Sequence, residues 1–457
     1  MSPEPIIRPS EDLVGSAVGF ARLPPEIVME IFTQCCSEQY PIHASEAVRI
    51  SHVDSAWRNL ALSMPTLWAT FSIKIAQLVE PRLGGKHIHT RLNEGVLRLL
   101  DVHLERSAKS SLSFSVDLYT IDSEMMPAAL DLLTPLVGHS DRWKFVKLPY
   151  VPEFAPLFAR LIGRLGRLER LDLRVQEMHN DGVDRNYFAV APRLRRLALG
   201  ASLARNLPFP PNQLTELHLG AAPTMELSQF MTLCPCPYLT TLILNPYYPL
   251  QRQPAPQPLA PLLHLHTLIL AIRDGYSRNP TIEVLDLLTA PSLQNLEVVG
   301  VREIQLPRQA FVAFLERSGC TLQALSITYK DNLPVPTLLS NLRAVPSLTH
   351  LAIFARGKEH TALDLILQSL TLSDASREPL LPNLTSFQLQ ATTFRATLVD
   401  MVASRLAYGL EPNISRLREL ILRIPNTEAA HQLDTLISDK GLVVSYPPRY
   451  KRSTLFI

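Results

Sequence analysis

Histidine and cysteine pairs are the residues of this sequence that come nearest to metal or redox chemistry. His87-Ile88-His89 and His264-Leu265-His266 each lack a third ligand nearby, whereas a zinc site needs at least three protein ligands. Cys234-Pro235-Cys236 has one residue between its thiols, which is not the spacing of a zinc knuckle or of a thioredoxin motif. We therefore interpret all three pairs as structural and expect no metal site.

Motifs for covalent or phosphate chemistry are also absent from the sequence. It has no GxSxG nucleophile elbow, no phosphate-binding P-loop and no dinucleotide fingerprint. Its carboxylates are scattered, and none forms a convincing acid–base pair. The sequence therefore predicts a protein that is not an enzyme, with no catalytic residue and no cofactor.

The composition of the chain indicates which classes of partner and which cellular compartment to expect. The chain has 457 residues, 19% of them charged, and a net charge of only +2, so we expect neither nucleic acid nor a membrane as a partner. Its five cysteines do not form a disulfide framework, and no apolar run has the length of a signal peptide or a membrane span. These features favour a cytoplasmic or nuclear protein.

Three short helices are expected near the N-terminus, after a disordered tail over residues 1–20. The first begins at Pro24-Pro25-Glu26, a favourable helix start, and the second covers residues 45–53. The third covers residues 56–64, with Asp54 and Ser55 suited to its N-cap. A module this small is marginally stable and usually needs a partner to cover its apolar surface. We therefore interpret it as a docking module.

The same residues resemble an F-box. The matching motifs are Leu23-Pro24-Pro25-Glu26-Ile27, Ile31-Phe32, Ile50-Ser51-His52-Val53, Trp57-Arg58 and Ala61-Leu62-Ser63-Met64-Pro65-Thr66-Leu67-Trp68. They are similar to the expanded F-box family of mushroom-forming (basidiomycete) fungi, although that family usually carries cysteine where this chain has Asp54. The resemblance covers about a tenth of the chain. It implies binding to the Skp-type adaptor, and so to the cullin scaffold, of a cullin–RING ubiquitin ligase. The adaptor-binding residues that it implies are Leu23, Pro24, Ile27, Val28, Ile31, Val53 and Trp57.

One phrase recurs through the rest of the chain: leucine, two residues, leucine, one residue, an aliphatic. Its copies begin at Leu168, Leu194, Leu214, Leu239, Leu265, Leu293, Leu322, Leu348, Leu384 and Leu417, and Trp143 begins a weaker first copy. Successive leucine copies start between 20 residues (Leu194 to Leu214) and 36 residues (Leu348 to Leu384) apart. Most of these spacings lie in or near the range of leucine-rich repeats.

Each phrase predicts a short strand with its leucines on one side, followed by a helix-like segment. Examples of such segments are residues 281–288, 308–316, 336–342 and 398–406. Proline stands two residues before the first leucine in five copies, where it ends a helix and leads into a strand: Pro192, Pro237, Pro291, Pro346 and Pro382. We therefore expect an α/β fold that is an irregular leucine-rich-repeat solenoid, with a parallel sheet on the concave face and helices on the convex face.

The predicted organisation has four parts: the tail over residues 1–20, the F-box module over 21–73, a linker with a connecting helix over 74–110, and the solenoid over 111–457. Residues 111–150 are interpreted as degenerate first repeats that cap the array. Asparagine or cysteine, expected three residues after each phrase to link successive turns, is missing from all ten leucine copies. The backbone groups of the turns must therefore be satisfied in another way.

A client protein is expected on the concave face, where residues alternate with the buried leucines. The candidates are Arg170, Arg174, Arg196, His218, Ile243, Ile269, Glu297, His350 and Phe354. The alternative for these residues is a solvated sheet face that binds nothing. The leading hypothesis is a substrate-receptor adaptor of a ubiquitin ligase. The alternative is a ligase-independent repeat scaffold that uses the helices as an N-terminal cap, and exposure of the Leu23–Phe32 face would distinguish the two.

Overall fold

The structure is a computed structural model of the chain. It describes residues 23–36, 45–74, 94–117, 125–175, 186–200, 208–223, 230–232, 234–247, 258–272, 280–300, 306–329, 334–355, 360–373, 378–390, 396–407, 414–423 and 441–445. The chain divides into unit 1, Met1–Leu194, and unit 2, Arg195–Ile457. The predicted disordered tail and the pair His87 and His89 lie outside the described residues.

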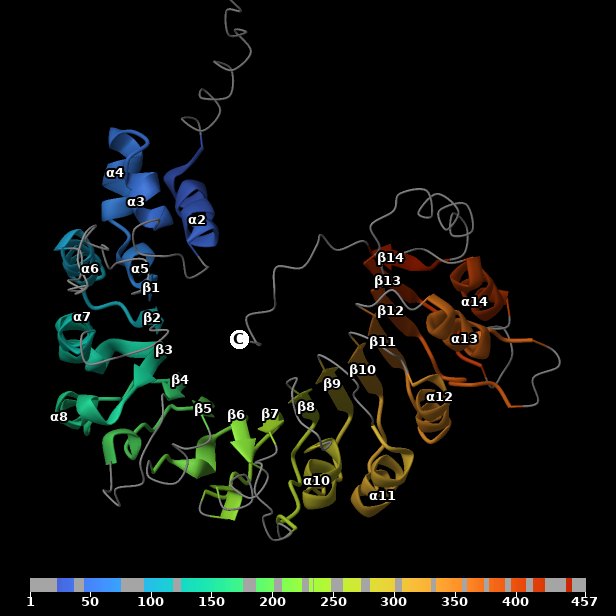
Figure 1. Ribbon diagram of the computed structural model, residues 1–457. Helices are drawn as coiled ribbons and strands as arrows, with labels where there is room; N and C mark the ends of the chain where they lie inside the picture. Colours follow the sequence, from blue (N-terminus) through green and yellow to red (C-terminus); the bar gives the residue numbers. More distant parts are fainter. Residues whose placement is uncertain are drawn as a thin grey trace, which may run out of the picture. The chain divides into compact units, whose positions relative to one another are not determined.

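Unit 1 begins with short helices and continues as a parallel sheet that carries helices on one face (Figure 1). Its N-terminal helices are α2 (Pro25–Cys35), α3 (Glu46–Ser51), α4 (Ser55–Leu62) and α5 (Pro65–Trp68). Its strands, paired in chain order, are β1 (Thr70–Lys74), β2 (Leu112–Asp117), β3 (Trp143–Tyr150) and β4 (Arg170–Val175). The helices between these strands are α6 (Glu94–Arg106), α7 (Met126–Gly138) and α8 (Ala155–Phe158).

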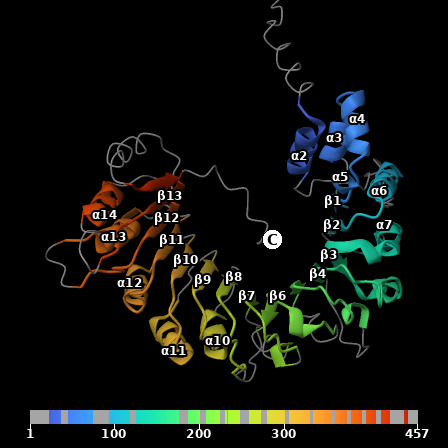
Figure 2. The same ribbon diagram turned by 180° about the vertical axis from the view of Figure 1, so that it is seen from behind.

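Unit 2 repeats the same arrangement with more strands. Its strands, again parallel and in chain order, are β5 (Arg196–Gly200), β6 (Glu216–Pro223), β7 (Thr241–Tyr247), β8 (Thr267–Ile272), β9 (Asn295–Gly300), β10 (Ala324–Tyr329), β11 (His350–Ala355), β12 (Ser386–Gln390), β13 (Glu419–Arg423) and β14 (Val443–Ser445). Its helices are α10 (Pro280–Leu287), α11 (Arg308–Ser318), α12 (Val335–Arg343), α13 (His360–Leu370) and α14 (Ala396–Ala407). Viewed from either side, these helices cover one face of the sheet (Figure 2). We call the opposite face of each sheet its inner face.

The leucines of the phrase set the register of the strands in unit 2. The second leucine of each copy, or the residue in its place, pairs with its counterpart on the next strand: Leu197, Leu217, Leu242, Leu268, Leu296, Leu325, Leu351, Phe387 and Leu420. None of these side chains is more than 2% exposed. The continuous burial of this row of side chains holds the repeats together. The parallel pairing of the strands, with helices between them, confirms the predicted α/β class with a parallel sheet.

Backbone hydrogen bonds at the start of each strand link the repeats of unit 2. The carbonyl of Thr240 accepts from the N–H groups of His266 and Thr267, at 2.9 and 3.0 Å. The same two-donor arrangement occurs at the carbonyls of Arg195, Thr215, His266, Gln294, Gln323, Thr349 and Thr385. We call these eight groups the carbonyl ladder. The ladder pairs backbone groups of neighbouring repeats at the start of each strand without asparagine. Asparagine was expected at the other end of the strand, in the turn that follows it.

Arginines on the helical side satisfy the carbonyls at helix ends. Arg405 of α14 donates to the carbonyls of Leu370, Leu380 and Leu381, at 2.9, 2.6 and 3.0 Å, and so closes the end of α13. Arg317 of α11 bonds carbonyls at the end of α10 in the same way, and in unit 1 Arg164 bonds the last residue of α7. A cation suits a helix C-terminus, whose carbonyls are unpaired and carry partial negative charge.

The sheet of unit 1 begins earlier than the sequence predicted. Strand β1 pairs with β2 along its whole length, so the first strand starts at Thr70 rather than after residue 110. Phe71 of β1 stacks on Phe114 of β2, with ring centroids 5.7 Å apart. The third predicted helix, residues 56–64, corresponds to α4, which ends at Leu62, and Pro65 then begins the short helix α5. The predicted boundaries at residues 73 and 110 therefore fall inside one packed unit.

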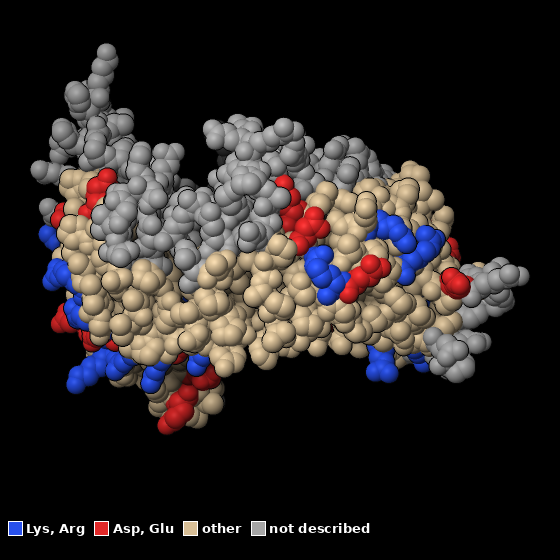
Figure 3. Space-filling view, turned by 90° about the horizontal axis from the view of Figure 1, so that it is seen from below, with Lys and Arg blue, Asp and Glu red and all other residues tan. Residues whose placement is uncertain are grey.

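Charged side chains on the molecular surface are sparse and of both signs. In the view of Figure 3, lysines and arginines lie among aspartates and glutamates, and uncharged residues cover most of the described surface. No single-sign field of the kind that attracts nucleic acid is visible on this face.

Candidate functional site

The helices α2 to α5, called here the helical module, have helix starts that the sequence specifies locally. Pro25 and Glu26 open α2, where a missing N–H costs nothing and a negative charge is favourable. Asp54 is the N-cap of α4, and its Oδ1 accepts the backbone N–H of Trp57 at 2.8 Å. The capping role predicted for Asp54 is confirmed.

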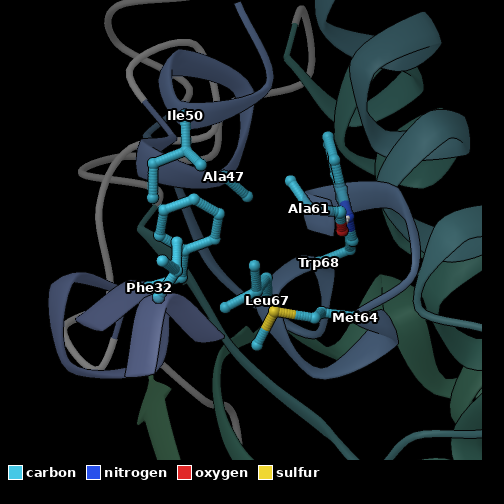
Figure 4. Close-up of a cluster of buried hydrophobic side chains, with 8 residues drawn as sticks. Phe32, Ala47, Ile50, Ala61, Met64, Leu67 and Trp68 are labelled. Atoms are coloured by element: carbon cyan, nitrogen blue, oxygen red, sulfur yellow. Dashed lines mark hydrogen bonds between the residues drawn. The ribbon is translucent and has the colours of Figure 1, made fainter. Parts of the chain in front are cut away.

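One side of α2 builds the core of the helical module. Val28 and Phe32 are buried there against Ala47 and Ile50 of α3 and against residues of α4 and α5 (Figure 4). The remaining members of this cluster are Ala61, Met64, Leu67 and Trp68. The ring of Trp57 lies 4.9 Å from that of Phe32 and is half-buried at the edge of the cluster.

The start of α2 carries exposed apolar residues, whereas Glu26, Glu30, Thr33 and Gln34 make the rest of its exposed side polar. Leu23 keeps 37% and Ile27 keeps 49% of its surface open to solvent, and Pro24 between them is also exposed. We call Leu23, Pro24 and Ile27 the α2 patch. Val53, in the turn between α3 and α4, is 59% exposed. Solvent-facing aliphatic side chains close together on so small a module are typical of a surface that a partner covers.

The seven predicted adaptor-binding residues therefore divide into two groups. Leu23, Pro24, Ile27 and Val53 are accessible, whereas Val28 is a core residue, and Ile31 and Trp57 are half-buried. Val28 is 6% exposed and lies in the core of the helical module.

The helical module is attached to helix α6 through Trp68. Its indole N–H donates to the Ala61 carbonyl at 2.9 Å, and its own carbonyl bonds Nδ1 of His103 on α6, also at 2.9 Å. Arg106 lies over the Trp68 ring, 4.4 Å from its centroid. Burial lowers the pKa of His103, which is fully enclosed, so His103 is neutral at physiological pH and donates from Nδ1.

The inner face of unit 1 carries a network of charges. Asp117 of β2 pairs with Arg174 of β4 at 3.0 Å and with Lys147 of β3 at 3.8 Å. Arg170, a predicted client residue like Arg174, lies on the same strand and is half-buried. Sequence reasoning missed Lys74, Asp117 and Lys147, because the predicted organisation places β1 in the F-box module and the start of the linker, and β2 and β3 in degenerate repeats. Their alternation with buried Ile73, Val116, Val146 and Leu148 was the available signal.

The inner face of unit 2 is less accessible in its first part than predicted. Ile243 and Ile269, proposed as client contacts, are only 1% and 7% exposed. Beside Ile269 in the paired row lies Glu297, whose pKa is raised by burial. Arg196 pairs with Glu216 at 3.2 Å, and His218 lies between Ala198 and Ile243 in register. The two isoleucines therefore belong to the packed interior.

The later strands of unit 2 present more accessible side chains. His350 at the start of β11 is exposed, and its Nδ1 lies 2.8 Å from the hydroxyl of Thr349. Phe354 lies at the other end of β11. The guanidinium carbon of Arg423 lies over its ring, 6.0 Å from the ring centroid. Glu419 accepts from the hydroxyl of Ser386 at 2.7 Å. Of the predicted client residues in unit 2, Arg196 and His350 are exposed, and His218, Glu297 and Phe354 are half-buried.

The thiols and imidazoles that opened the sequence analysis do not form a metal site among the described residues. No group of three or more histidine, cysteine, aspartate or glutamate side chains there is placed to hold an ion. Cys234 and Cys236 are buried free thiols, and the Sγ of Cys236 points to the Cys234 carbonyl at 3.3 Å. His264 stacks on Tyr238, with ring centroids 5.9 Å apart.

Comparison of the sequence with protein-family models and with curated proteins returned no match. Within the described residues, none of the helices has both the length and the apolar character that crossing a membrane requires. The two candidate surfaces are thus the α2 patch with Val53, and the inner sheet faces of the two units.

Proposed function

We propose that this chain is a substrate-receptor adaptor of an SCF-type cullin–RING ubiquitin ligase. The helical module would act as an F-box that binds the Skp-type adaptor and thereby the cullin scaffold. The leucine-rich repeats would hold a client protein, whose identity the chain does not reveal. The receptor performs no chemistry of its own, and it acts by keeping the client at a high local concentration near the ligase. A cytoplasmic or nuclear location accompanies this role.

Two exposed aliphatic side chains carry the proposal: Leu23 just before α2 and Ile27 near its start. The inner side of α2, with Val28 and Phe32, completes the core of the helical module, so the fold does not require these two positions to be apolar. Leu23 and Ile27 are nevertheless apolar and exposed. Exposed aliphatic side chains next to a rigid core are the kind of residue that becomes a binding anchor when a partner covers them. The F-box resemblance assigns these same two residues to adaptor contact.

The direct test is co-purification of the full chain with a recombinant Skp-type adaptor. Burying a whole isoleucine or leucine side chain stabilises a complex by about 1.5–3 kcal/mol. Because Ile27 is half exposed and Leu23 about a third exposed, covering both contributes about 2 kcal/mol together. The double variant Leu23→Ala, Ile27→Ala should therefore bind the adaptor about 30-fold more weakly, without a large change in thermal stability.

Ile162→Ala is the matched control, since Ile162 is 54% exposed but lies in unit 1 outside the helical module. It should bind the adaptor like the unchanged chain. Absence of adaptor from the co-purified material, or equal affinity of the double variant and the control, contradicts the ligase proposal.

A ligase-independent repeat scaffold is the second candidate, and one observation favours it. The hydrogen bond from His103 to the Trp68 carbonyl, with the contact between Val102 and the core of the helical module, joins that module to helix α6 of the repeat sheet. A helical cap that only closes the sheet would show the same contacts. Under that function, the Leu23→Ala, Ile27→Ala variant would keep every interaction of the chain.

A further inference from the structure

The inner face of β1 to β4 orders its side chains in three rows across the strands. The first row contains Thr70, Ser113, Phe145 and Arg170, and the second contains Ser72, Ser115, Lys147 and Asp172. The third row contains Lys74 and Asp117, which are paired in register, and then Arg174, which pairs with Pro149. Hydroxyl side chains therefore occupy the β1 and β2 side of the face, and charged side chains surround them.

Positive charge exceeds negative charge in these rows. The cations are Lys74, Lys147, Arg170 and Arg174, and the anions are Asp117 and Asp172. Asp117 is engaged by Arg174 and Lys147, at 3.0 and 3.8 Å. Neither Lys74 nor Arg170 forms an ion pair within the part of the chain that the structure describes. The face thus has a local excess of two positive charges, although the whole chain is almost neutral.

Partial burial makes this excess more effective than the same charges in open solvent. The side chain of Lys147 is only 26% exposed, and burial lowers its pKa despite the neighbouring Asp117 and Asp172. A cation that is desolvated and incompletely neutralised gains from the approach of an added anion. Hydroxyl groups of Ser113 and Thr70, both half-buried on the same face, can donate hydrogen bonds to such an anion.

The spacing of the cations indicates how far an anionic ligand must extend. Lys74 on β1 and Arg170 on β4 are three strands apart, roughly 14 Å, and four residues apart along the strands, roughly 13 Å, so their backbones are separated by roughly 19 Å. A single phosphate group cannot reach both, whereas carboxylates along an extended peptide can. The exposed ring of Phe145 next to Arg170 adds an apolar contact for the same peptide.

We propose that the inner face of β1 to β4 binds an extended acidic segment, rich in Asp and Glu, of a partner protein. Lys74, Lys147 and Arg170 supply the positive charges, and Ser113, Thr70 and Phe145 supply hydrogen bonds and apolar contact. In the ligase function proposed above, on which this inference rests for the partner's role as client, the acidic segment would belong to the client.

Binding is measured with the full chain and a fluorescein-labelled peptide of alternating Glu and Ser, followed by anisotropy. Loss of one partly buried ion pair corresponds to about fivefold in affinity, so Lys147→Ala with Arg170→Ala should weaken binding about 25-fold. Affinity should also fall as salt is raised, since salt screens charges more than a Debye length of about 10 Å apart. Arg160→Ala is the matched control, because Arg160 is exposed on the helical side of unit 1.

Four comparisons can overturn the proposal: a Lys peptide, a phosphopeptide, a uridine homopolymer and the double substitution. A peptide with Lys in place of Glu should not bind, and a Ser-rich peptide with a single phosphoserine should bind more weakly than the Glu peptide. Tighter binding of the phosphopeptide or of a uridine homopolymer, equal binding of the Lys peptide, or no effect of the double substitution refutes it. Lys147→Gln, with its thermal unfolding recorded in parallel, separates loss of charge from loss of fold.

The two proposals fail separately. The Lys147→Ala, Arg170→Ala variant should still co-purify with the Skp-type adaptor, and the Leu23→Ala, Ile27→Ala variant should still bind the acidic peptide. Peptide binding without adaptor binding leaves the acidic-segment site intact and removes the ligase function, and the reverse result removes only the site.

Discussion

Replacement of Arg405 by methionine tests whether arginines at helix ends hold neighbouring repeats together. Arg405 is fully buried, and its guanidinium donates to three backbone carbonyls, those of Leu370, Leu380 and Leu381. Methionine keeps the apolar stem and removes the donors. A buried acceptor left without a donor costs about 1–3 kcal/mol. The Leu381 carbonyl also accepts the backbone N–H of Leu384, so only the carbonyls of Leu370 and Leu380 lose their donor, at a cost of about 2–6 kcal/mol.

The Arg405→Met substitution also removes a buried positive charge, and this gain in stability opposes the loss of the hydrogen bonds. Burial lowers the pKa of Arg405 from 12.5 to about 10. Since one pKa unit corresponds to about 1.4 kcal/mol, removing the buried charge returns about 3 kcal/mol. The middle of the range for the lost hydrogen bonds is larger than this gain. We therefore expect Arg405→Met to lower the free energy of unfolding of unit 2 by about 1 kcal/mol.

The measurement must report on unit 2, because all three tryptophans, Trp57, Trp68 and Trp143, lie in unit 1. Urea unfolding followed by circular dichroism, with hydrogen exchange of peptides from α13, meets this need. Arg343→Met is the control, since Arg343 is an exposed arginine at the end of α12, and it should change stability by less than about 0.5 kcal/mol. An Arg405→Met chain as stable as the unchanged one would refute the reasoning, because desolvation would then outweigh the three hydrogen bonds.

Two further predictions concern the helical module and its attachment. Asp54→Ala removes the acceptor for the Trp57 N–H and should lower the stability of the helical module by about 1 kcal/mol. Asp54→Asn keeps an acceptor and should retain most of that stability, and tryptophan fluorescence during urea unfolding measures both variants. His103 has a pKa below its usual 6.5, so the unfolded chain takes up a proton that the folded chain excludes, and stability should fall as pH drops below about 6.5. His103→Phe should remove that part of the pH dependence, and parallel stability curves for both chains would contradict a neutral, buried His103.

Much of the repeat architecture could be predicted, because it depends on the spacing of buried leucines. Leu268, Leu296 and Leu325 lie in register as the phrase required, and α11 begins at the predicted Arg308. Strand position follows from period-two alternation, which one sequence contains in full. The start of the sheet at Thr70 was missed, because Phe71 and Ile73 bury their side chains without the leucine phrase.

The candidate sites were harder to predict than the fold. The helical spacing of Ile27, Val28, Ile31 and Phe32 predicts one apolar stripe on α2. Which of these side chains faces the core depends on where α3 and α4 pack, so the sequence could not show that Val28 is buried and Ile27 exposed. Similarly, alternation placed Ile243 and Ile269 on the inner face but could not show that they are buried there. Burial is a property of the packed chain, and local pattern constrains only which residues share a face.

Because the carbonyl ladder fixes neighbouring strands at their starts, the spacing of side chains across the inner face of unit 2 does not depend on how many residues connect the strands. Ala198 and His218 are 20 residues apart, and Phe354 and Gln390 are 36 residues apart, yet both pairs face each other across neighbouring strands. Each pair is therefore separated by about 4.8 Å. Residues can be inserted between strands without changing the distances along this face, so the recognition surface and the connecting segments are free to change independently.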